Sequence, residues 1–177
     1  MDQIHYCKSW FSAKKRPLQV WDEAKARQAH EDRKNYTVLI GELERPTHVV
    51  LISNKFVAVD FMDDNLREAL SYHFKEYEPG RLFLSMAVYR EFYGESDNVT
   101  GGTAYTFKRD GAVIIRRETF TPHHLDVDEH LIEEAERVVD VAGNYDRYPA
   151  FGAYDRVCIA ERPTPEYVAD RVLGSEH

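Results

Sequence analysis

The sequence lacks most features that would place it in a specialised class of protein. Its 177 residues include only two cysteines, Cys7 and Cys158, which excludes a disulfide framework and a cysteine-based zinc site. No apolar run approaches the roughly 20 residues that span a bilayer, and the N-terminal residues lack the apolar stretch of a signal peptide. We therefore expect a cytoplasmic protein without a membrane segment.

Common catalytic motifs are also missing. There is no Gly-x-Ser-x-Gly elbow and no phosphate-binding loop with a following lysine. The pair Gly101-Gly102 precedes a strand-like run and so does not open a helix, as a dinucleotide-binding fingerprint would. These absences favour a protein that is not an enzyme and that carries no cofactor.

Charge is abundant but unevenly spread. The chain has 23 Lys and Arg against 31 Asp and Glu, a net charge of −8. Residues 1–34 carry a net +3, whereas residues 121–177 alone carry −8. The only basic cluster is Lys14-Lys15-Arg16, too small to neutralise several phosphates, so nucleic-acid binding is disfavoured. An acidic surface of this kind favours a basic protein partner.

The hydrophobic pattern predicts a single α+β domain over residues 1–177. Residues 1–34 form a peripheral basic segment whose part 18–34 reads as a helix, because it is rich in Ala, Glu, Lys and Arg. Residues 36–119 predict an antiparallel meander, since short β-rich runs are separated by short turns. The expected strands are residues 36–40, 48–52, 56–61, the end of 66–77, 81–93, 103–107 and 112–115. Asp110-Gly111 between two of them is a strong hairpin signal.

The last third, residues 120–177, predicts an acidic helix-strand-helix segment. Leu131, Ala135, Val138 and Ala142 recur at helical spacing after Asp126, which could cap the helix. A short strand is expected at residues 156–160 and a last helix between residues 164 and 174. The predicted fold is therefore an antiparallel meander sheet packed by N-terminal, middle and C-terminal helices.

Four carboxylates on the middle helix form the first candidate site. Glu129, Glu133, Glu136 and Asp140 are spaced i, i+4, i+7 and i+11, which would place them in one stripe along the helix. A solvated outer face explains such a stripe. The alternative is a docking surface for a basic partner, because an acidic face accelerates association with one.

A histidine-rich stretch forms the second candidate site. His123, His124, Asp126 and His130 are residue types that ligate zinc, iron or manganese. The spacing lacks His-x-x-x-His on one helix face, and a helix-entry loop explains the same residues. We expect no metal here, and keep a small metal-assisted or acid/base hydrolase as the alternative function.

The chain resembles bacterial toxin-immunity proteins in general character. It is small, acidic and free of the catalytic motifs above, and the resemblance implies an intracellular inhibitor that occludes a basic surface of a toxin. It rests on character only and assigns no residues. The predicted function is thus a cytoplasmic protein-binding module with Glu129, Glu133, Glu136 and Asp140 at its interface. A further interpretation is a subunit that forms homo-oligomers through the edge of its sheet.

Overall fold

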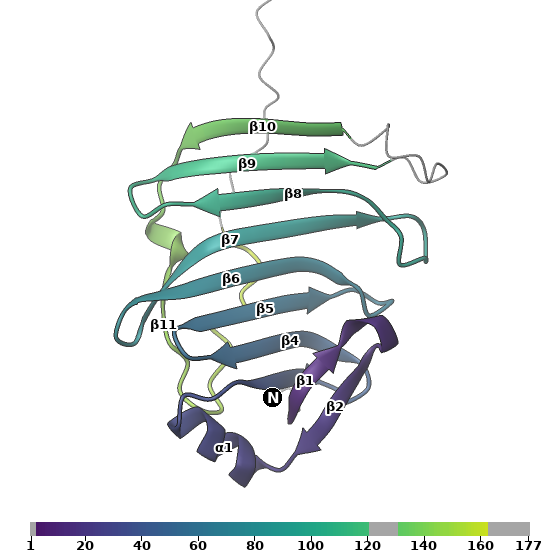
Figure 1. Cartoon of the computed structure of the whole chain (residues 1–177), viewed down its shortest axis with the longest axis vertical. Coiled ribbons are helices and arrows are strands. Elements are labelled where there is room, and N and C mark those ends of the chain that lie inside the picture. The colour runs from purple at the N-terminus through teal and green to yellow at the C-terminus, as the bar shows by residue number, and fades with distance from the viewer. Residues whose placement is uncertain (1–2, 121–130, 163–177) are drawn as a thin grey trace, which may run out of the picture.

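Eleven strands form one antiparallel sheet, and one α-helix is found among the described residues (Figure 1). The computed structural model describes residues 3–120 and 131–162. The strands are β1 (Ile4–Phe11), β2 (Arg16–Trp21), β3 (Tyr36–Gly41), β4 (Pro46–Ser53), β5 (Phe56–Met62), β6 (Glu68–Glu78), β7 (Arg81–Phe92), β8 (Val99–Phe107), β9 (Ala112–Thr119), β10 (Leu131–Val138) and β11 (Tyr145–Arg147). The helix is α1 (Glu23–Glu31), and two 3-10 turns are η1 (Ser12–Lys14) and η3 (Ala142–Asn144).

The meander predicted over residues 36–119 is present. Strands β3 to β9 follow one another across the sheet as antiparallel neighbours, and β10 continues the series to one edge. The expected hairpin at Asp110-Gly111 joins β8 to β9, with Gly111 at a φ of 94°, a backbone conformation that favours glycine. At the other end β1 pairs with β3, and β2 forms the second edge.

The main core lies on one face of the sheet. It contains alternating side chains of β3 to β9, among them Tyr36, Tyr72 and Phe74, which are fully buried. The chain after β10 crosses this face behind the sheet in Figure 1 and contributes Tyr154 and Val157 to the core. Burial of these large apolar surfaces is the main force that holds the segment against the sheet.

The hairpin of β1 and β2 lies over part of the opposite face (Figure 1). A small second core of Cys7, Leu39 and Val49 packs beneath it. At the hairpin tip, the Lys15 ammonium lies 2.7 Å from an Asp97 carboxylate oxygen and 2.9 Å from the Asn65 carbonyl. The tip is thereby attached to the loops at the far ends of β5 and β7.

The predicted α+β architecture with three helices is wrong, because the molecule is mostly β. Residues 131–138 of the expected middle helix form β10, whose eight residues pair with β9. No strand forms at residues 156–160, where residues 155–158 make a turn, and the expected last helix lies outside the described residues. Residues 131–138 are good helix formers, but pairing with β9 places them in a strand.

The N-terminal helix exists but is shorter than predicted. It spans α1, and Asp22 caps it by accepting a hydrogen bond from the Lys25 backbone nitrogen at 2.8 Å. The first predicted residues, up to Trp21, belong to β2 instead. Ala26 and Ala29 are the buried residues of α1, so small side chains let it lie close to the core.

Candidate functional site

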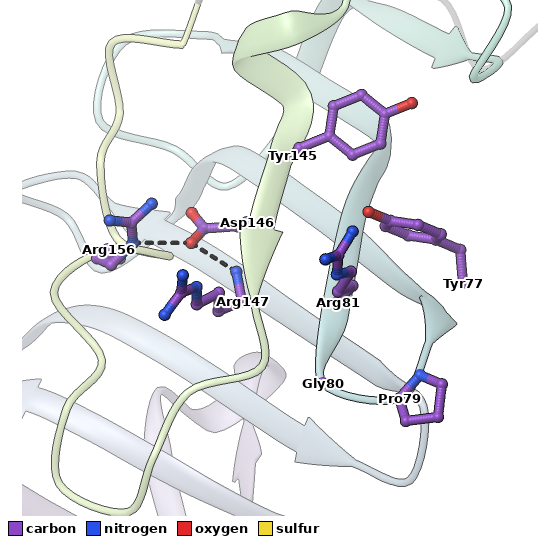
Figure 2. Close-up of a pocket in the computed structure, with 8 residues that line it drawn as sticks. All are labelled: Tyr77, Pro79, Gly80, Arg81, Tyr145, Asp146, Arg147 and Arg156. Atoms are coloured by element: carbon purple, nitrogen blue, oxygen red, sulfur yellow. Dashed lines mark hydrogen bonds and ion pairs between the residues drawn. The ribbon is translucent and has the colours of Figure 1, made fainter.

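The candidate site is a pocket of about 460 Å³ where β7 begins (Figure 2). Three of its side chains are arginines and two are tyrosines. The residues that line it are Tyr77, Pro79, Gly80, Arg81, Tyr145, Asp146, Arg147 and Arg156.

The pocket exists because β8 does not pair with the first residues of β7. Pairing between β7 and β8 extends only as far as Met86, opposite Thr106. The free edge at residues 81–83 is taken by β11, which arrives from the end of the chain. The β6–β7 turn at Gly80 forms the floor, and its carbonyl accepts a hydrogen bond from the Tyr148 nitrogen at 2.9 Å.

Pairing of β11 with β7 brings two arginines together. Arg81 and Arg147 are direct cross-strand partners, a position in which like charges destabilise a sheet. Figure 2 shows the two side chains extending in different directions, which reduces their repulsion. Glu78 lies 3.6 Å from Arg81, and no ion pair of Arg147 is found among the described residues. The pairing of β11 with β7 thus places two positively charged side chains at the same pocket.

Asp146 anchors the other side of the pocket. Burial alone would raise the pKa of its carboxyl group, but hydrogen bonds from Arg162, the Arg147 backbone and Arg156 outweigh burial and lower it. Arg156 donates to this carboxylate at 2.9 Å while 74% of its own side chain stays exposed. Arg162 also donates to it, and its side chain is only 7% exposed. Asp146 therefore fixes Arg156 at the rim and leaves most of that guanidinium accessible.

Two tyrosine rings form the remaining wall. Tyr77 and Tyr145 meet edge to face, with ring centroids 5.6 Å apart. Arg109, from the β8–β9 turn, lies over the Tyr77 ring at 4.2 Å. The cation–π contact holds a further positive charge beside the pocket.

The net charge of the pocket is opposite to that of the chain. Its lining has three arginines and one aspartate, a formal charge of +2 within a protein of −8. Arginine presents a planar fork of donors that matches the oxygens of phosphate and carboxylate groups. The geometry can therefore bind an anionic group, with the tyrosines available to contact the rest of a ligand.

A second polar cluster lies on the opposite face of the sheet. Ser71 donates a hydrogen bond of 2.6 Å to the Asp60 carboxylate, and Arg90 donates one of 2.8 Å to the Ser71 hydroxyl. Burial raises the pKa of Asp60 to about 6, against the smaller effect of the Ser71 hydrogen bond. Arg90 also lines two cavities, of about 300 and 310 Å³. Ser71 is buried, so this cluster joins neighbouring strands and leaves no accessible nucleophile.

The acidic residues predicted from the sequence do not form the expected stripe. Glu133 and Glu136 lie on β10, where side chains alternate, so they point to opposite faces of the sheet. Asp140 follows the strand and accepts a hydrogen bond from the Ala142 nitrogen at 2.8 Å, and Glu129 lies outside the described residues. Their role in binding a partner stays a prediction, without the helix face on which it was based.

The predicted histidine cluster cannot be placed. His123, His124, Asp126 and His130 lie outside the described residues. Across residues 3–120 and 131–162, no group of three metal-ligating side chains is found. Within these same ranges no helix is long and apolar enough to cross a membrane.

The arginine pocket was missed from the sequence. Its two paired arginines are far apart along the chain, and β11 has only three residues, too few for a periodic signal. The three arginines among residues 145–162, a stretch with balanced charge inside an acidic third, were the one available clue. No protein-family model, curated protein or solved structure matches the chain. The chain is thus a mostly β protein with a pocket lined by three arginines.

Proposed function

We propose that the protein binds a small anionic molecule, a phosphate ester by preference, in the arginine-lined pocket. The observation that carries the proposal is the direct cross-strand placement of Arg81 and Arg147 beside the exposed guanidinium of Arg156. The three guanidinium groups that line this pocket favour a ligand group with several oxygens over a single carbonyl or hydroxyl.

The expected affinity follows from the number of contacts. A hydrogen bond to a charged group contributes about 1.5–3 kcal/mol net, so two such bonds correspond to millimolar binding or somewhat better for inorganic phosphate alone. The Tyr77 and Tyr145 rings would add affinity for a phosphate ester with a planar group, since aromatic faces and edges attract other rings.

The test is a calorimetric titration with inorganic phosphate, pyrophosphate and a set of nucleoside monophosphates. We expect Arg147→Gln and Arg81→Gln each to weaken binding about tenfold, and the double variant to abolish it. Arg45→Gln is the matched control, because Arg45 lies beside the β5–β6 turn at the other end of β6, where it donates to the Asp64 carbonyl. Equal affinity in all variants, or no binding of any of these anions, would overturn the proposal.

The function predicted from the sequence stays a separate hypothesis. A protein-binding module for a basic partner such as a toxin needs an acidic surface, whereas the pocket is basic. Our proposal also keeps the cytoplasmic location, which is supported by Cys7 and Cys158 both being free thiols, as is usual in a reducing compartment.

A further inference from the structure

The edge strand β10 has several exposed apolar side chains and, within the described residues, one unpaired side. One side pairs with β9, and no strand among the described residues pairs with the other side. Three large apolar side chains are exposed on it, Leu131 by 58%, Ile132 by 44% and Val138 by 84%. An exposed edge with apolar side chains is a template for pairing with another strand.

The opposite edge of the same sheet shows how pairing is normally prevented. β2 begins with Arg16 and Pro17, and proline lacks the N–H that a new neighbour would need. Gln19 has a φ of 51°, which interrupts the regular strand. β10 contains no proline, glycine or lysine and no residue with positive φ. The two edges differ in the features that block strand addition.

The β10 sequence is complementary to itself when reversed about Ala135. In an antiparallel pair centred on Ala135, Ile132 lies opposite Val138 of a second copy. Glu133 lies opposite Arg137, and twofold symmetry forms each of these contacts twice. Apolar pairs at both ends and ion pairs nearer the centre are the cross-strand combinations that stabilise a sheet.

We propose that the protein forms a twofold symmetric homodimer in which the β10 strands of two copies pair antiparallel, centred on Ala135. One pairing in this register is unfavourable, since Glu134 lies opposite Glu136 of the second copy. Arg116 of the adjacent strand lies 3.9 Å from Glu134 and reduces that repulsion. The partner is a second copy of this chain, which is an inference independent of the anion pocket.

Cysteine cross-linking tests the register directly. In a Cys158→Ser background, Ala135→Cys places two thiols on the twofold axis, within the Cα separation of 4.4–6.8 Å that a disulfide requires. We expect oxidation to give a covalent dimer. Val138→Cys alone is the matched control, because its two copies would be about 20 Å apart, six residues along the strands. A mixture of Ile132→Cys and Val138→Cys proteins should cross-link to each other.

A charge exchange tests the same interface without cysteines. Light scattering with size-exclusion chromatography should give twice the monomer mass at high concentration. Glu133→Arg or Arg137→Glu alone should return the protein to monomer, and the double variant should restore the dimer. Circular dichroism on each variant separates loss of dimer from loss of fold. A monomer at all concentrations, or equal cross-linking at positions 135 and 138, would overturn the proposed interface.

Discussion

Asp60 provides a test of how a partly buried carboxyl group makes the folding stability depend on pH. Its carboxylate accepts a hydrogen bond from Ser71, and burial raises its pKa to about 6 from an ordinary 3.8. The folded protein therefore binds a proton at Asp60 more tightly than the unfolded chain does. This contribution to stability is complete below pH 3.8 and is lost as the pH rises through 6.

The size of the effect follows from the shift. A difference of about two pKa units corresponds to about 3 kcal/mol, with a slope of up to about 1.4 kcal/mol per pH unit between pH 4 and 6. Asp60→Asn removes the charge and retains both the shape and an oxygen that can accept from Ser71. We therefore expect the variant to gain stability relative to the natural protein as the pH rises from 4 to 7.

The assay is urea unfolding at several pH values, with the difference in unfolding free energy between the two proteins as readout. Asp64→Asn is the control, since Asp64 lies exposed in the β5–β6 turn. If the Asp60→Asn difference stays constant between pH 4 and 7, the Asp60 carboxyl group titrates normally and the effect of burial is refuted.

Two further predictions concern close packing and burial. Gly102→Ala should destabilise the fold by about 3 kcal/mol or more in urea unfolding, because its Cβ would lie 2.3 Å from the Tyr89 carbonyl oxygen; a loss below 1 kcal/mol would contradict this. Cys7 and Cys158 should react slowly with a thiol reagent at pH 8 until the protein unfolds, since burial raises their pKa values to about 11 and 12. Rapid labelling of both in the folded protein would contradict this expectation.

The central meander could be predicted because its strands are buried on a defined face. In β5, for example, Val57, Val59 and Phe61 face the main core, and Ala58 and Asp60 lie between them on the other face. That alternation is a local property of the sequence, and the short turns between strands exclude parallel crossovers. A strand can be predicted from the sequence where one buried face gives its residues a period of two.

The edge strand β10 could not be predicted for the opposite reason. Ala135 is its one buried position, so its sequence carries almost no period-two signal. Its Glu, Ala, Leu and Arg residues are good helix formers, and the wrong prediction of a helix followed from them. What selects the strand is the neighbour: Arg116 and Arg117 of β9 lie opposite Glu134 and Glu133. Such cross-strand pairs can be recognised only once the partner strand is known.

The arginine pocket depends on contact between strands that are even further apart in the sequence. Arg81 and Arg147 become neighbours only because β8 ends early and β11 fills the free edge of β7. Neither arginine stands in a local motif, and the net charge of the surrounding third points to a basic partner instead of an anion. Total charge describes the field far from the protein, whereas a ligand in the pocket meets the few groups within a Debye length of about 8–10 Å. An acidic protein can thus bind an anion when its fold gathers positive charges from distant parts of the chain.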